Sequence, residues 1–504
     1  MTAATASLPE NALREVDYSQ VDVARLIGEL RAVLPPVALL HDSEDMRPYE
    51  CDGLSIYRQV PLAVVLPGTE AEVAAVLKIC HSVGVPVVAR GAGTGLSGGA
   101  LPHAHGVLLS LARMNKILNI DPLARTAVVQ PGVRNLRISE EVAPHGLYYA
   151  PDPSSQIACS IGGNVAENAG GVHCLKYGLT VHNVLRIRGV TIDGEVVEIG
   201  NHGLDAPGYD LLALMHGSEG MLAVVTEITV KLTPKPQFAQ CVLAAFDDVI
   251  KAGEAVAAVI AAGIIPAGLE MMDQPATAAV ESFVHAGYPL DAAAILLCES
   301  DGTPEEVAEE IQRMCAVLES HGATEVRISR DEAERMRFWA GRKAAFPAAG
   351  RISADYYCMD GTIPRKRLGE MLTAIQGMEK TYDLRCINVF HAGDGNMHPL
   401  ILFDANVPGE LERAEEFGAA ILDLSVDLGG TITGEHGVGI EKINQMCRQF
   451  NVAERQTFFR VKAAFDPKGL LNPGKAIPSM NRCAEFGRMH VQGGQVPHPE
   501  IERF

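Results

Sequence analysis

The chain has 504 residues, of which 47% are hydrophobic and 5% aromatic, so it can build sizeable cores and is not disordered as a whole. Its 42 basic and 62 acidic residues give a formal net charge of −20, which argues against nucleic-acid binding and against direct docking on anionic membranes. Of the 49 glycines, 18 lie in five short clusters. Such clusters indicate backbone that closely approaches a ligand or turns with positive φ.

Targeting and membrane signals are missing from the sequence as printed. No stretch reaches the roughly 18 apolar residues of a membrane-spanning helix, and the first residues lack the basic and apolar regions of a secretory signal. The 11 cysteines contain no CxxC pair, so no iron–sulfur or cysteine-zinc site is predicted. We therefore expect a cytoplasmic protein without a membrane span of its own.

The first half of the chain predicts a lead-in and one domain. Residues 1–55 are expected to form a helical lead-in, and residues 56–235 the first domain. Within it, Thr69 and Glu72 form a T-x-x-E capping box at the start of a helix. Asp193-Gly194 is a two-residue hairpin signal. Strands are predicted at 61–66, 85–89, 107–111 and 127–130.

The second half predicts another domain, over 236–478, followed by a polar tail at 479–504. Pro234 and Pro236 mark the boundary between the two domains. The alternation of strands and helices suggests a broad sheet with helices on one face. Strands are predicted at 241–246, 294–300, 325–329 and 387–391, and helices from Thr303, from Pro364 and over 452–465.

The first glycine cluster, RGAGTGLSGG, covers 90–99 and contains G-x-G-x-x-G. A Rossmann loop needs a helix directly afterwards, but ALPHAHGVLLSL follows, with Pro102 and then a strand. A dinucleotide site of that type, and with it NAD, is therefore not predicted. The alternative is a strand–loop–strand cradle whose backbone N–H groups surround a diphosphate.

Two further runs of small residues strengthen this interpretation. The segment PDPSSQIACSIGGNVAENAGG, over 151–171, consists largely of turn-forming and hydrogen-bonding residues, and HGSEGMLAVVTEITV ends in a strand. Three such loops in one domain predict a large cofactor with a diphosphate and a planar ring.

A histidine and glutamate constellation lies further on. HAGDGNMH places His391 and His398 on either side of a turn, and the apolar flanks predict two strands that let both imidazoles converge. GGTITGEHGVG adds Glu435 and His436. A single histidine is usually structural, but His391, His398 and Glu435 together favour a Zn²⁺ or similar divalent site with positions open to substrate. His436 is then suited to remove a hydroxyl proton.

The three glycine runs closely resemble the FAD-binding domain of the vanillyl-alcohol oxidase, or PCMH, type. The match continues through HAGDGNMHPLILFD, TITGEHGVGIEK and FDPKGLLNPGKAIP, and nearly the whole chain is similar to the FAD-linked D subunits of bacterial glycolate oxidases. This resemblance implies an α+β fold. A two-subdomain FAD-binding domain would precede a substrate or cap domain with a broad, mostly antiparallel sheet and helices, and a C-terminal helical segment would follow.

The resemblance also implies the residues that hold the cofactor. Some members attach FAD through a histidine in the first loop; Thr94 occupies that place here, so we expect FAD to be bound non-covalently. The residues implied in FAD binding are Arg90, Gly91, Ala92, Gly93, Thr94, Gly95, Leu96, Ser97, Pro151, Asp152, Ser154, Gly162, Gly163, Asn164, Asn168, Gly171, Val225 and Asn472.

The implied reaction is the oxidation of a small 2-hydroxy acid, glycolate to glyoxylate and also D-lactate to pyruvate, by hydride transfer to flavin. Arg342 would clamp the substrate carboxylate, and His436 would be the base. Phe346 and Cys358 stand where relatives that act on larger diacids have polar contacts, which implies a small pocket. Electrons would leave through a second FAD-binding subunit and an iron–sulfur subunit, with the assembly peripheral to the inner membrane.

Three alternatives stay open at this point. The nearest is a D-lactate dehydrogenase, or another D-2-hydroxy-acid dehydrogenase, on the same scaffold. A zinc hydrolase would explain the histidine-rich loop without a flavin. A catalytically silent electron-relay subunit is the third.

Overall fold

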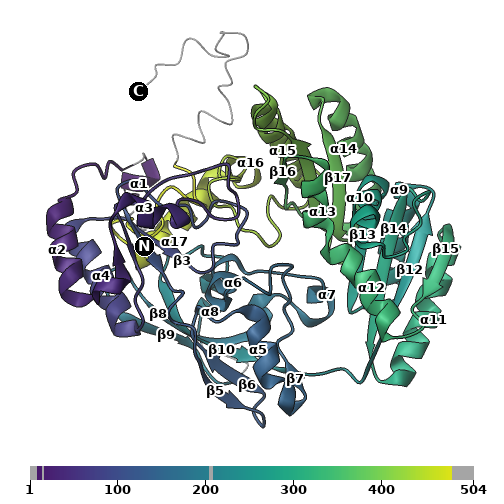
Figure 1. The fold of residues 1–504 in the computed structure, drawn as a ribbon, viewed down its shortest axis with the longest axis horizontal. Helices are drawn as coiled ribbons and strands as arrows, with labels where there is room; N and C mark the ends of the chain where they lie inside the picture. Colours follow the sequence, from purple (N-terminus) through teal and green to yellow (C-terminus); the bar gives the residue numbers. More distant parts are fainter. Residues whose placement is uncertain (1–7, 9, 14–15, 204–207, 480–504) are drawn as a thin grey trace, which may run out of the picture.

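The computed structural model describes residues 8, 10–13, 16–203 and 208–479. The start of the predicted lead-in and nearly all of the predicted tail lie outside these residues. The described chain forms two units that lie side by side (Figure 1). The first unit contains a four-stranded sheet, a five-stranded sheet and a two-stranded pair, and the second is built on one seven-stranded sheet. This arrangement confirms the predicted α+β fold.

The first sheet of the first unit has the strand order β1-β2-β4-β3 (Leu39–Leu40, Ala63–Val65, Val107–Ser110, Val87–Arg90). The three longer strands are parallel, and β1 is antiparallel to β2. Helix α4, Glu70–Val83, has the predicted Thr69 cap, whose Oγ1 accepts the N–H of Glu72 at 3.2 Å. The other half of the predicted capping box differs, because Glu72 Oε2 accepts the N–H of Gly68 at 2.6 Å and not that of Thr69. The helix ends at Gly84, whose φ of 76° closes the last turn. Helix α2, Val23–Val33, packs its buried leucines into the same core.

The second sheet of this unit is antiparallel, with the order β5-β6-β10-β8-β9 (Ile117–Asp121, Thr126–Val129, Val224–Lys231, Val184–Val190, Val196–Gly200). The predicted hairpin joins β8 to β9, but its loop is longer than two residues. The loop is wider because Gly194 donates its N–H to Thr191 O instead of continuing the strand pairing. Strands β7 (Leu147–Tyr148) and β11 (Thr233–Pro234) form a separate pair.

The second unit is a seven-stranded, wholly antiparallel sheet, which confirms the predicted broad sheet. Its order is β15-β12-β14-β13-β17-β18-β16 (Ala323–Ile328, Phe238–Phe246, Ala294–Gly302, Gly268–Asp273, Arg385–His391, Asn396–Phe403, Asp355–Cys358).

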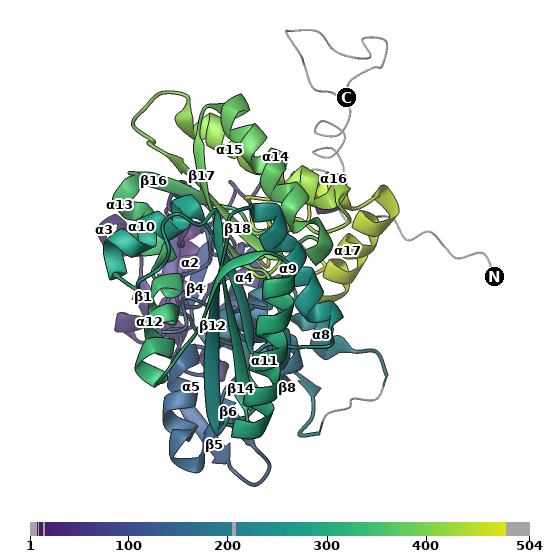
Figure 2. The same ribbon diagram turned by 90° about the vertical axis from the view of Figure 1, so that its right-hand side faces the viewer.

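Helices cover both faces of this sheet, so the expectation of helices on one face is wrong (Figure 2). Strand β12 explains the difference. The consecutive residues Val242 and Leu243 point to opposite faces of the sheet and belong to two different hydrophobic cores. Both faces are apolar, so helices must bury each of them. One face carries α9, α11, α14 and α15 (Val249–Ala261, Pro304–Ser320, Leu368–Tyr382, Glu410–Asp427). The other carries α10, α12 and α13 (Gln274–Val284, Glu332–Lys343, Ala345–Ile352).

The end of the described chain returns to the first unit. After α17, Val452–Phe465, the segment near Leu471 lies beside β3, and Asn472 donates its N–H to Val87 O at 2.8 Å. The exact domain limits stay a prediction. The remaining short helices are α1 (Glu10–Leu13), α3 (Ser43–Met46), α5 (Asn135–Val142), α6 (Ile161–Glu167), α7 (Cys174–Tyr177), α8 (Leu211–Met215) and α16 (Met446–Gln449), with 3-10 turns at Pro36–Ala38, Arg47–Tyr49, Ala143–His145, Thr180–His182 and Arg365–Arg367.

A charged network joins the two units. His173 of the first unit contacts Asp152 at 2.7 Å through Nδ1 and Glu299 of β14 at 3.3 Å through Nε2. Arg335 and Trp339 of α12 also donate to Glu299. Burial alone would lower the pKa of His173, but the two carboxylates outweigh it and raise that pKa to about 10. His173 is therefore a charged link between the units.

This link makes stability depend on pH. In the unfolded chain His173 has a pKa of about 6.5, so the folded state keeps a proton that the unfolded state loses above that pH. The stabilisation is complete below about pH 6.5 and is lost as the pH rises towards about 10. We expect the melting temperature of wild type to exceed that of His173→Asn most at about pH 6, with the gap closing by about pH 10. A gap that stays constant over this range would contradict the charged link.

Candidate active site

A cavity of about 450 Å³ lies between the two units. Most of its wall comes from the predicted glycine loops, which confirms that these loops surround one ligand-sized space. The second unit contributes the remaining wall. Its lining residues there are Lys343, Phe346, Pro347, His398, Glu435 and His436.

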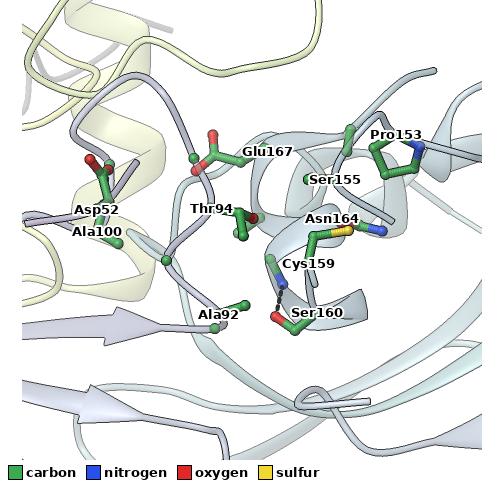
Figure 3. A pocket seen from close by; sticks show the side chains of 18 of the residues that line it. Asp52, Ala92, Thr94, Ala100, Pro153, Ser155, Cys159, Ser160, Asn164 and Glu167 are labelled. Atoms are coloured by element: carbon green, nitrogen blue, oxygen red, sulfur yellow. Dashed lines mark hydrogen bonds between the residues drawn. The ribbon is translucent and has the colours of Figure 1, made fainter. Parts of the chain in front are cut away.

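The first loop leaves β3 at Arg90 and reaches β4 without forming a helix, as expected for a strand–loop–strand cradle. Gly93 adopts a φ of 73°, which favours glycine. A Cβ atom at Gly91 would collide with Ser160 Oγ, so a side chain there would force that hydroxyl out of its position as the cap of α6. Figure 3 shows this wall, with Thr94 of the loop and Asn164 of helix α6 among the labelled residues.

The second run forms the opposite part of the cradle. Ser160 caps α6, and its Oγ accepts the N–H of Gly163 at 3.4 Å (Figure 3). Gly162 packs directly on Pro131, where a Cβ atom would lie 2.6 Å from the proline Cβ. The two glycine runs therefore fit against each other and against the loop at Pro131, with little tolerance for added atoms.

Twelve of the predicted FAD-binding residues line the cavity: Arg90, Gly91, Ala92, Gly93, Thr94, Gly95, Leu96, Ser154, Gly162, Gly163, Asn164 and Val225. The others support the wall from behind. Ser97 Oγ donates to His436 O, Asn472 Nδ2 donates to Gly99 O and Glu219 O, and Asn168 Oδ1 accepts the Val181 N–H. Pro151, Asp152 and Gly171 form the turn beside His173, where Gly171 lies against Asp152 O.

Three acidic residues in the cavity wall were not predicted from the sequence, namely Asp52, Glu167 and Glu219. Burial raises the pKa of each carboxyl group, and for Glu167 the neighbouring charge of Glu219 raises it further. Glu219 lies within the third glycine run, HGSEGMLAVVTEITV, and this position was the sequence signal that could have identified it as a cavity residue. Its two carboxylate oxygens accept the N–H groups of Val438 and Gly439 at 2.7 and 2.8 Å.

The predicted metal ligands converge at the second-unit end of the cavity. His391 ends β17 and His398 lies in β18, and the two strands pair across the predicted turn. Glu435 Oε1 lies 3.4 Å from His391 Nε2 and 3.0 Å from His398 Nε2. The ligand atoms of the three residues all lie within 4.8 Å of one another. Glu435 Oε2 is buried and has no hydrogen-bond partner, which suits an oxygen that would ligate a cation.

Two hydrogen bonds orient the imidazoles for such a role. His391 Nδ1 lies 2.8 Å from Glu270 Oε1, and His398 Nδ1 lies 3.2 Å from the carbonyl oxygen of Met359. Both acceptors favour a proton on Nδ1, which would leave the Nε2 lone pair of each histidine for a bound cation. Burial alone would raise the pKa of Glu435, but hydrogen bonds and charge from both histidines hold that pKa well below its ordinary value. Glu435 is therefore ionised and available as a ligand.

A second group of possible ligands shares His398. Cys358, His398 and His436 also lie within reach of one another. Burial holds the pKa of the Cys358 thiol well above its ordinary value, and nearby carboxylates raise it further. Because a thiol must lose its proton to ligate a metal, this group suits a cation less well than the one with Glu435.

His436 lies beside the cluster of His391, His398 and Glu435. Its ring is stacked on that of His398, with the ring centroids 4.9 Å apart. Its Nε2 is 3.8 Å from Glu435 Oε1. Burial lowers the pKa of His436 to about 4, so the imidazole is neutral at pH 7 and able to accept a proton. The arrangement therefore places a neutral base beside a three-ligand cluster. His398, Glu435 and His436 line the cavity, whereas His391 is not among its lining residues.

Arg342 does not line the cavity. Its guanidinium is buried and binds Glu270 Oε2 through Nε at 2.8 Å and Nη2 at 2.7 Å. The adjacent Lys343 is exposed and does line the cavity. The role of Arg342 as a carboxylate clamp stays a prediction. Glu270 was not predicted as a site residue, although a lone acidic side chain in the apolar strand segment GLEMM was a signal.

The comparisons with known proteins agree with this architecture. The family model "FAD binding domain" matches residues 61–200, and "FAD linked oxidases, C-terminal domain" matches residues 235–476. Glycolate oxidase subunit GlcD of Escherichia coli strain K12 is 64% identical over 495 residues, which cover 98% of each chain.

The chain belongs to the FAD-linked oxidases. This FAD-linked oxidase is also 33% identical to a D-lactate dehydrogenase of Anaerostipes hadrus, over 92% of this chain and 99% of that protein. In fold it resembles p-cresol methylhydroxylase, with a TM-score of 0.79 and 18% identity, over 91% of this chain and 97% of the other. The family and the prediction of an FAD-linked oxidoreductase are thereby confirmed.

FAD fits the cavity of this FAD-linked oxidase. Glycines at which an added Cβ atom would collide with neighbouring atoms line a space of ligand size, and the three glycine runs meet around it. Among the described residues no helix is both long enough and apolar enough to cross a bilayer.

We expect Gly91→Ala to weaken FAD binding roughly tenfold to a hundredfold. The added methyl group must displace Ser160, and overpacking of this kind costs about 1–3 kcal/mol. Titration of apoprotein with FAD, followed by flavin fluorescence, measures the change. Gly28→Ala is the control, because a Cβ atom at this helical position meets nothing within 4 Å. Equal FAD affinity in Gly91→Ala and wild type would contradict the close fit.

Proposed function

We propose that the protein oxidises glycolate to glyoxylate with FAD as the hydride acceptor. The observation that carries this proposal is the neutral base His436 beside the His391, His398 and Glu435 cluster, in the cavity that the FAD loops form. The 64% identity to the Escherichia coli glycolate oxidase subunit supports glycolate as the substrate. Phe346 in the cavity wall supports a small substrate with few polar groups.

The residues that would hold FAD are the first loop, α6 with its cap, and Val225. Bound FAD supplies the acceptor for the hydride that leaves the α carbon. Thr94 lines the cavity at the place where some members of the family carry an attaching histidine, and its hydroxyl offers no comparable nucleophile. The cofactor is therefore proposed to be held non-covalently.

His391, His398 and Glu435 are proposed to hold one divalent cation, Zn²⁺ or a similar ion. Such an ion supplies positive charge that lowers the pKa of a substrate hydroxyl group. His436 Nε2 accepts the hydroxyl proton, since that atom faces Glu435 and its imidazole is neutral. Arg342 is the proposed partner of the substrate carboxylate, which it would share with Glu270.

We propose that electrons leave the reduced protein through partner subunits, namely a second FAD-binding subunit and an iron–sulfur subunit. The name of the Escherichia coli relative, a subunit of glycolate oxidase, supports an assembly. In this proposal the protein is cytoplasmic and reaches the inner membrane through those partners.

The base has a direct test. We expect His436→Ala to slow anaerobic flavin reduction by glycolate about 10²–10⁴-fold, because the loss of a general base typically has that effect. Stopped-flow absorbance of the FAD-loaded chain measures the rate. His103→Asn is the control, since His103 lies outside the FAD cavity. An unchanged rate in His436→Ala would remove His436 from the reaction.

The substrate has a separate test. We expect glycolate to give a higher kcat/KM for flavin reduction than D-lactate and D-2-hydroxyglutarate. A preference for D-lactate would favour a D-lactate dehydrogenase, which the Anaerostipes hadrus relative makes the second candidate. A yellow protein that none of the three acids reduces would favour an electron-relay subunit, and a colourless protein that hydrolyses a substrate would favour a zinc hydrolase.

A further inference from the structure

We propose that Glu270 is a positioning residue that sets the orientation of His391 and thereby the metal affinity of the cluster. This inference rests on the proposed function, since it assumes that His391 is a ligand. Glu270 itself does not line the cavity, so it would act through its two neighbours, His391 and Arg342.

Glu270 is fixed by the sheet around it. It lies in β13, where the next two residues, Met271 and Met272, pair with Phe390 and Val389 of the strand that carries His391. The turn after His391 is also tied to β13, because Gly393 donates its N–H to Leu269 O at 2.9 Å. The side chain is 1% exposed, so its charge must be met by protein groups.

The two carboxylate oxygens of Glu270 have separate partners. Oε1 faces His391 Nδ1 at 2.8 Å, while Oε2 accepts from Arg342 Nε at 2.8 Å and lies 2.7 Å from Nη2 in the same ion pair. Arg342 is 2% exposed and supplies a permanent positive charge. The Glu270–Arg342 pair is thus neutral without a proton on His391 Nε2. With a cation bound beside Glu435, His391 could donate Nδ1–H to Glu270 and offer its Nε2 lone pair to that cation.

His398 provides an internal comparison. Its Nδ1 faces the backbone carbonyl of Met359, whereas His391 Nδ1 faces the side chain of Glu270. Only the second contact can be removed by substitution. A carboxylate partner also makes an imidazole a more basic ligand than a carbonyl partner does, so His391 is the ligand whose strength depends on a side chain.

A purely structural ion pair is the competing explanation. In that case Glu270 would only neutralise Arg342 within the core, and its loss would lower stability without a specific effect on metal binding. Asp273 allows the two explanations to be separated. It is a buried carboxylate of the same strand, and its Oδ2 accepts from the N–H and Nδ2 of Asn388, away from the cluster.

The test measures Zn²⁺ affinity of the full FAD-loaded chain by competition with a chromogenic chelator. We expect Glu270→Gln to bind Zn²⁺ about 10–100-fold more weakly than wild type, which is typical when the hydrogen-bond partner of a ligating histidine is removed. Glu270→Asp, which keeps the charge but shortens the side chain, should fall between the two. Asp273→Asn should keep wild-type affinity. The flavin spectrum reports whether each variant is folded, and excess Zn²⁺ should restore flavin reduction by glycolate in Glu270→Gln.

The outcomes separate the two proposals. If wild type binds Zn²⁺ and the folded Glu270 variants bind it equally well, the positioning role is wrong while the proposed metal site stands. A loss of affinity in Asp273→Asn equal to that in Glu270→Gln would assign the effect to general destabilisation and would also overturn the role. If wild type binds no more Zn²⁺ than a His391→Ala/His398→Ala variant, the proposed metal site fails, and the role of Glu270 fails with it. If Glu270→Gln does not fold, Glu270→Asp decides by the same comparison.

Discussion

One buried carboxylate determines where the reactive residues lie. Asp360 accepts the backbone N–H groups of Gly434, Glu435 and His436, and Lys442 Nζ lies 3.0 Å from its Oδ2. Burial alone would raise the pKa of Asp360, but Lys442 and the nearby histidines keep it below its ordinary value, so the carboxylate stays charged. Three consecutive N–H groups directed at one charge fix the loop. The positions of Glu435 and His436 depend on that contact.

The same loop is then tied to the FAD cradle. Ser97 Oγ donates to His436 O, while Ile440 and Glu441 donate their N–H groups to Ser97 O. Glu219 adds two bonds from its own glycine run to the loop. The cluster and the cradle come from different units, yet backbone groups join them directly. The loops that form the cavity therefore also fix the position of one unit relative to the other. The charged link at His173 is a second contact between the two units.

The sequence predicted features that are local in the chain. Glycine runs, the Thr69 cap and the hairpin with His391 and His398 follow from neighbouring residues, so they could be found without a structure. The partners Glu270 and Asp360 could not be found, because their contacts span 121 and 75 positions. Helices on the second face of the large sheet were missed although the sequence carried a sign of them. The run from Cys241 to Phe246 in β12 is continuously apolar, which is typical of a strand with both faces buried. The resemblance to the family pointed to Arg342. Its contact with Glu270 could not be predicted, because the two residues are 72 positions apart in the chain.

Charge balance in the described part of the cluster explains why these distant pairs matter. Lys442 balances Asp360, and Arg342 balances Glu270. Glu435 faces only imidazoles at short range, and its second oxygen has no partner. Without a cation, His391 carries an additional proton. Burial alone would lower the pKa of His391, but Glu270 and Glu435 raise that pKa well above its ordinary value. A divalent cation bound there would replace that proton, and its remaining positive charge would match one substrate carboxylate. The two buried ion pairs thus leave the cluster with a deficit of positive charge that suits a metal ion together with an anionic substrate.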